Sequence, residues 1–174
     1  MGAFFTNPWT IGISAALGVG YVPEDRRIFT DLTVTENLEV GRQAARAGAA
    51  HWTSERLFRL FPNLAEMRDR PGAHMSGGEQ QMLTIARTLM GNPRAVLLDE
   101  PSEGLAPLIV QQMVRTVLEL KNEGLTVLLC EQNLRFAQAV ADRAFIVEKG
   151  HVRYSGAMHA LEADAALREQ YLSL

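Results

Sequence analysis

The sequence has 174 residues, of which 47% are hydrophobic, 21% charged and 7% aromatic, which is enough for one sizeable core and too little for two ordinary domains. Its 17 basic and 20 acidic residues give a net charge of −3, and without a basic tract we expect no nucleic-acid partner. The single cysteine, Cys130, excludes a disulfide framework, and its place in the apolar run LTVLLC predicts a buried thiol. No run reaches the roughly 18 apolar residues of a membrane span.

The first half of the chain is predicted to be mostly helical. Residues 1–17 are expected to form an irregular leader, and the run GVGYVP over 18–23 predicts a short buried strand that ends at its proline. A Thr-x-x-Glu capping box begins a helix over 33–46. A second helix is expected over 54–61, where a proline follows it, and residues 63–75 are expected to form a loop.

The second half alternates strands with helices. Three apolar runs predict buried strands, namely Ala95–Asp99, Leu125–Cys130 and Ala144–Glu148. Helices are expected between them, over 106–123 and 134–141, and a final strand over 151–155 precedes a C-terminal helix. Strands that are apolar throughout, rather than alternating, are typical of burial on both faces, so we predict an α/β fold with a parallel sheet and helical crossovers.

Two of the predicted strands deliver polar side chains to one edge of that sheet. The first ends in Asp99 and Glu100, and the second is followed by Glu131 and Gln132. In an open parallel sheet, ligands gather at the carboxyl ends of the strands. A carboxylate there can hold Mg²⁺, and the next one can orient or deprotonate a water molecule. The alternative is a strand end with two solvated acids.

The segment that begins at Ser76 is predicted to start a helix with an anion site. Ser76 and Glu79 fit a second capping box, and Gly77 and Gly78 would leave the amides of the first turn uncovered. A helix N-terminus with free N–H groups and a positive dipole end attracts phosphate. The helix should end at Gly91-Asn92-Pro93. A well-capped surface helix is the alternative.

Three motifs, MSGGEQQML, AVLLDEPSEGLAP and LLCEQN, together resemble the nucleotide-binding subunits of ABC transporters. The segments GYVPEDRRIF and GLAP are most similar to those of the branched-chain amino acid importer group. A urea-importer group has similar segments. The resemblance runs from Gly18 to the C-terminus. It implies a P-loop NTPase-like fold with a small helical subdomain over about 33–90, with the N-terminal part of that fold missing.

The resemblance also implies a site. It places the signature motif, which binds the γ-phosphate of ATP held by the opposite subunit, at Ser76, Gly77, Gly78, Glu79 and Gln80. It implies that Asp99 supports Mg²⁺ and that Glu100 is the general base or the water-orienting carboxylate. Glu24 falls at the usual Q-loop glutamine, near the metal, and Gln132 falls at the usual switch histidine. The implied partners are a second ATP-binding subunit, in a homo- or heterodimer, and membrane permease subunits at the cytoplasmic face of the inner membrane.

One motif of the family is not found in these 174 residues. No G-x-x-x-x-G-K-S/T sequence occurs, and neither Lys121 nor Lys149, the two lysines, follows a glycine. That loop wraps phosphates in backbone amides, so we expect marginal stability and weak or no ATP binding by the chain alone. Two interpretations stay open: an importer ATPase subunit, or a non-catalytic module that pairs with an intact ATPase. A soluble ABC ATPase of DNA repair or translation is disfavoured, since no long coiled-coil insertion is present.

Overall fold

The computed structural model describes residues 17–172, so all of the predicted leader except Leu17 lies outside the described residues. The chain divides into two compact units, the first up to Cys130 and the second from Glu131. Within the described range, no helix is both long and apolar enough to cross a membrane.

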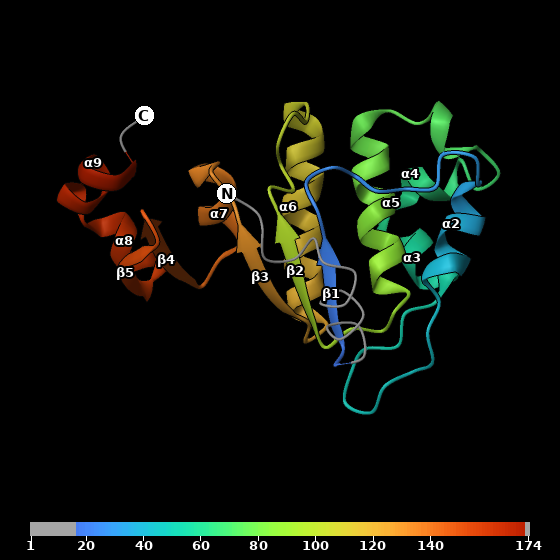
Figure 1. Cartoon of the computed structure of the whole chain (residues 1–174), viewed down its shortest axis with the longest axis horizontal. Helices are drawn as coiled ribbons and strands as arrows, with labels where there is room; N and C mark the ends of the chain where they lie inside the picture. The colour runs from blue at the N-terminus through green and yellow to red at the C-terminus, as the bar shows by residue number, and fades with distance from the viewer. Residues whose placement is uncertain (1–16, 173–174) are drawn as a thin grey trace. The chain divides into compact units, whose positions relative to one another are not determined.

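A three-stranded parallel sheet forms the centre of the first unit (Figure 1). Its order is β1-β2-β3, with bounds Val19–Val22, Ala95–Asp99 and Thr126–Cys130. Helix α6 (Pro107–Asn122) is the crossover from β2 to β3, and Gly124 ends the connection with a φ of +81°. A left-handed turn of this kind favours glycine. The predicted parallel sheet with helical crossovers is confirmed for these strands.

Burial differs between the central strand and its neighbour β3. In β2 the side chains of Val96, Leu97 and Leu98 are all buried, as predicted. In β3 the residues alternate between half-buried and exposed, and Leu128 is 60% exposed. The prediction of a buried Cys130 is wrong, because this residue is the exposed last residue of β3. An apolar run predicts burial only where neighbouring elements cover it.

Four helices and a 3₁₀ turn lie between β1 and β2. They are α2 (Val34–Gly41), α3 (Ser54–Leu60), α4 (Pro62–Ala65), the 3₁₀ turn Gly72–His74 and α5 (Gly77–Leu89). The α2 capping box at Thr33 and Glu36 is confirmed. The expectation of a loop over 63–75 is wrong in part, since Pro62 begins a short helix in addition to ending the previous one.

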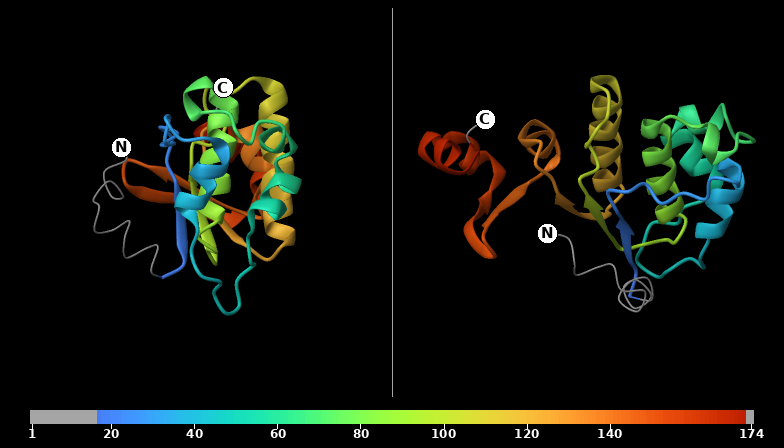
Figure 2. Two further views of the ribbon diagram at one scale, coloured as in Figure 1. Left: turned by 90° about the vertical axis from the view of Figure 1, so that its right-hand side faces the viewer. Right: turned by 45° about the horizontal axis from the view of Figure 1, so that its top comes forward.

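Helix α2 ends five residues earlier than predicted, for a tertiary reason. Arg42 has an extended ψ of 127°, and the next amide, that of Gln43, donates to the carbonyl of Met90 at 3.1 Å. That hydrogen bond to the end of α5 replaces a further helical one. The two helices also pack closely: the backbone of Gly41 lies so near the Arg87 carbonyl that an added Cβ would overlap it. Figures 1 and 2 show α2 beside α5.

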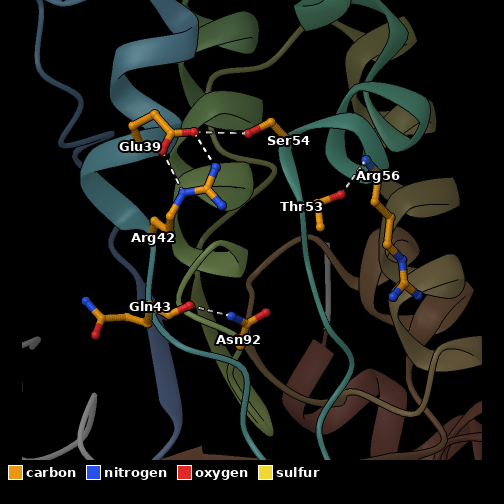
Figure 3. A network of polar contacts seen from close by, with 7 residues as sticks. All are labelled: Glu39, Arg42, Gln43, Thr53, Ser54, Arg56 and Asn92. Carbon is orange, nitrogen blue, oxygen red and sulfur yellow. Dashed lines mark hydrogen bonds and ion pairs between the residues drawn. The ribbon is translucent and has the colours of Figure 1, made fainter.

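The long connection from α2 to α3 is held at both ends by Asn92, just after α5. The Asn92 side chain is buried, and its Oδ1 accepts from the amide of Trp52 at 2.7 Å. Its Nδ2 donates to the carbonyl of Gln43 at 2.8 Å, the bond drawn in Figure 3. Asn92 has a φ of +51°, a conformation that asparagine tolerates better than most residues. One side chain therefore fixes where this loop leaves and rejoins the helices.

The second unit contains the remaining elements. They are α7 (Leu134–Val140), β4 (Arg143–Glu148), β5 (His151–Ala157), α8 (Met158–Ala163) and α9 (Ala165–Leu172). The tight turn at Lys149-Gly150 is confirmed, with a positive φ at both residues. The prediction that the strand at 144–148 joins the parallel sheet is wrong, because β4 pairs antiparallel with β5. The single C-terminal helix that we expected is two helices, α8 and α9.

Candidate functional site

The acidic end of β2 is built around a hydrogen bond between neighbouring strands. The Tyr21 hydroxyl on β1 donates to Oδ2 of Asp99, the last residue of β2, at 3.0 Å. Desolvation, this hydrogen bond and the charge of Asp99 raise the pKa of Tyr21 to about 12. The phenol therefore stays protonated at physiological pH and remains a donor, which restrains the Asp99 carboxylate.

Glu100 turns the chain sharply at the point where β2 ends. Its φ is +45°, an unusual value for a residue with a side chain. Its amide donates to the carbonyl of Cys130 at 2.9 Å, and its carbonyl accepts from the amide of Glu103 at 3.1 Å. Such strained backbone is found where surrounding structure holds it in place, often at functional sites. The hydrogen bonds on both sides of Glu100 supply that restraint.

Negative charge accumulates beside this turn. Glu24, an exposed residue that follows β1, has a raised pKa. The charge of Glu103 is the largest cause, followed by desolvation, a hydrogen bond with Glu103, and the charges of Asp99 and Glu100. Carboxylate oxygens are ligands that Mg²⁺ prefers, so the donor chemistry fits this ion. Among residues 17–172, however, no three His, Cys, Asp or Glu side chains are grouped closely enough to hold a metal. The role of Glu24 and Asp99 as Mg²⁺ ligands stays a prediction, supported by the chemistry of their carboxylates and not by a preformed cluster.

The capped start of α5 is confirmed in detail. The Ser76 Oγ accepts from the amide of Glu79 at 3.4 Å, and the Glu79 carboxylate accepts from the amide of Ser76 at 2.6 Å. The Gln80 side chain turns back and donates to the carbonyls of Gly72 and Met75, each at 3.2 Å. The first turn of α5 is thus tied to the 3₁₀ turn that precedes it.

The two glycines of this turn are half-buried, and side chains from two other segments lie close to them. The expectation of uncovered amides stays a prediction. A Cβ added at Gly77 would overlap Nη1 of Arg26, and one added at Gly78 would lie 2.9 Å from Cγ2 of Ile109 in α6. The Arg26 guanidinium also donates from Nη2 to the carbonyl of Glu103 at 2.9 Å. The glycines therefore allow side chains from two other segments to approach the helix.

Eight of the nine predicted site residues belong to the first compact unit, and Gln132 belongs to the second. Within the first unit, the charges of Asp99 and Glu100 both contribute to the raised pKa of Glu24. Tyr21 and Arg26 were not among the predicted site residues. Tyr21 looks like an ordinary strand residue, and Arg26 looks like part of a solvated charged turn, so only their contacts distinguish them.

Comparison with known sequences assigns the chain to a family. A sequence model described as ABC transporter matches residues 10–103, more than half of the chain. The chain belongs to this family, which confirms the predicted resemblance.

The chain is similar to ATP-binding proteins of two kinds of transport system. The chain is 43% identical over 154 residues to the high-affinity branched-chain amino acid transport ATP-binding protein BraG of Pseudomonas aeruginosa, covering 88% of this chain and 66% of BraG. It is 35% identical over 160 residues to the lipopolysaccharide export system ATP-binding protein LptB of Escherichia coli K12, covering 91% of this chain and 66% of LptB. The chain thus spans slightly less than two thirds of the length of these relatives.

Solved structures agree on the fold. The crystal structure of an ATP-binding cassette of an ABC transporter in its ADP conformation matches with a TM-score of 0.71 at 24% identity, covering 92% of this chain and 70% of that one. A nucleotide-free cassette matches with a TM-score of 0.70, over 92% and 70% of the two chains. The predicted ABC ATPase fold class is confirmed.

Proposed function

We propose that this chain acts as the ATP-binding subunit of an ABC importer and couples ATP hydrolysis to the uptake of branched-chain amino acids. The observation that carries the proposal is the presence, in one compact unit, of the capped first turn of α5 and the acidic end of β2. The similarity to the Pseudomonas branched-chain protein supports the solute class. The weaker similarity to an ATP-binding protein of lipopolysaccharide export supports the ATP-binding role, but it does not bear on the solute.

The signature role is assigned to the start of α5. In this proposal Ser76 and the backbone amides of the first turn bind the γ-phosphate of ATP held by a second ATP-binding subunit. The helix N-terminus offers N–H groups and a positive dipole end to that phosphate. The capping box presets the geometry of the turn, so little ordering is needed when the phosphate arrives. Because the phosphate belongs to the other subunit, this role requires a pair of chains.

The acidic end of β2 is assigned the metal and the water. Asp99, oriented by Tyr21, and Glu24 would hold Mg²⁺, which when bound neutralises charge on the phosphate oxygens. Glu100 would orient or deprotonate the attacking water. The Gln132 amide would donate a hydrogen bond to the γ-phosphate, which a glutamine can do although it transfers no proton. The further proposed partners are membrane permease subunits, with the chain held peripherally at the cytoplasmic face of the inner membrane.

The test of this function is ATP turnover by mixed pairs of this chain and BraG. We expect the chain to raise BraG turnover, and Ser76→Arg in this chain to reduce that gain at least tenfold, because a bulky cation replaces the phosphate-binding hydroxyl. Ser155→Arg is the matched control, since it makes the same change on an exposed residue of β5. An unchanged rate with Ser76→Arg would contradict the nucleotide contact. Restored leucine uptake in cells that lack their own branched-chain ATP-binding subunit would test the solute class.

A further inference from the structure

Arg26 lies where three segments of the first unit meet. Its backbone is in the turn after β1, two residues beyond Glu24, and has a φ of +48°. Its Nη2 donates to the carbonyl of Glu103 at 2.9 Å and lies 3.4 Å from a Cβ built at Gly104, in the loop that follows Glu100. Its Nη1 lies against Gly77, in the first turn of α5. One guanidinium therefore contacts the first turn of α5 and the loop that follows Glu100, and it extends from the turn that carries Glu24.

Glycines on both sides permit this arrangement. A side chain at Gly77 would occupy the space of the guanidinium, and a side chain at Gly104 would be strained by a φ of +63°. A cation beside a helix N-terminus is electrostatically unfavourable on its own. The contact is offset by the hydrogen bond between the charged guanidinium and the Glu103 carbonyl, and such charge-assisted bonds are among the stronger ones.

We propose that Arg26 is a positioning residue that clamps the first turn of α5 to the loop 101–106. The clamp keeps the start of the signature helix in a fixed position relative to the segment after Glu100, so that the two halves of the proposed nucleotide site move together. The significance of the clamp for nucleotide binding rests on the proposed function, whereas the clamp itself is a property of this chain.

The neighbouring arginine provides a matched control. Arg27 is also in the turn after β1, and its side chain is 59% exposed. Its guanidinium pairs with Asp25 at 2.7 Å, within the same turn. Replacing Arg27 removes the same charge from the same turn without removing a contact to α5 or to the loop 101–106. A difference between the two arginines therefore reports the clamp and not the net charge.

The experiment is amide hydrogen exchange on the full 174-residue chain without nucleotide, with thermal unfolding measured in parallel. In Arg26→Ala we expect amide exchange in residues 77–82 and 102–106 to rise about tenfold, the fold-change for a lost interaction of about 1.4 kcal/mol. Arg27→Ala should leave both segments unchanged. Arg26→Lys, which keeps a charge and a donor on a flexible stem, should restore part of the protection.

Two results would overturn the clamp. One is unchanged exchange in both segments of Arg26→Ala. The other is faster exchange throughout β2 and α5 with a lower melting temperature, which would make Arg26 a general stabiliser. Because no nucleotide is present, failure of the clamp is distinct from failure of the proposed function. The mixed-pair assay with Ser76→Arg tests the latter.

Discussion

Replacing Asn92 should destabilise the first unit more than any change at an exposed asparagine. Asn92→Ala removes an acceptor from the Trp52 amide and a donor from the Gln43 carbonyl, at 2.7 and 2.8 Å, in a buried site. Each lost hydrogen bond costs about 1 kcal/mol net, and more where the remaining partner stays buried and unsatisfied. An alanine at a φ of +51° adds about 1 kcal/mol of backbone strain. The two hydrogen bonds and the strain add to a loss of about 3 kcal/mol.

The assay is urea unfolding followed by circular dichroism and by tryptophan fluorescence in a Trp9→Phe background, in which Trp52 is the one tryptophan left of the two in the sequence. Asn92→Gly should be about 1 kcal/mol less damaging than Asn92→Ala, because glycine removes the strain but not the hydrogen-bond loss. Asn122→Ala, at the exposed end of α6, is the control and should change stability by less than about 0.5 kcal/mol. A loss below about 1 kcal/mol in Asn92→Ala would contradict a stabilising role of the two hydrogen bonds. Equal losses of unfolding free energy in Asn92→Ala and Asn92→Gly would show that backbone strain at position 92 contributes nothing.

Three further substitutions test the site. Tyr21→Phe should flatten the alkaline loss of stability, because desolvation, the hydrogen bond to Asp99 and the charge of Asp99 raise the folded-state pKa of Tyr21 from the ordinary 10.0 to about 12. The stability linked to the protonated phenol is therefore fully present below pH 10 and is lost between pH 10 and 12, which unfolding free energies at pH 8 to 11 would show. Ser76→Ala removes the α5 cap and should cost about 1 kcal/mol, or about 3 °C in melting temperature, and an unchanged melting temperature would contradict a stabilising cap. Gly78→Ala should lower the melting temperature despite the better helix propensity of alanine, because the new methyl meets Ile109, and Ile109→Ala in the same chain should reverse the sign.

Local features of this protein could be predicted from the sequence because their causes lie within a few residues. Both capping boxes depend on side chains three positions apart, and both are present as predicted at Thr33 and Ser76. The left-handed turn at Gly124 and the end of β2 at Asp99 likewise follow from residue type and hydrophobic pattern. The motifs MSGGEQQML, AVLLDEPSEGLAP and LLCEQN, in this order along the chain, were enough to predict the family.

Tertiary structure alone decided the features that join distant segments. Helix α2 ends early because Gln43 bonds to Met90 at the end of α5, and β4 forms a separate two-stranded antiparallel sheet with β5. The contacts of Tyr21 and Arg26 join residues 78 and 77 positions apart. No pattern in one segment reports which groups of another will be within hydrogen-bonding distance, because that distance is set by how the whole unit packs. The residue types of the candidate site were therefore predictable, and the groups that hold them in place were not.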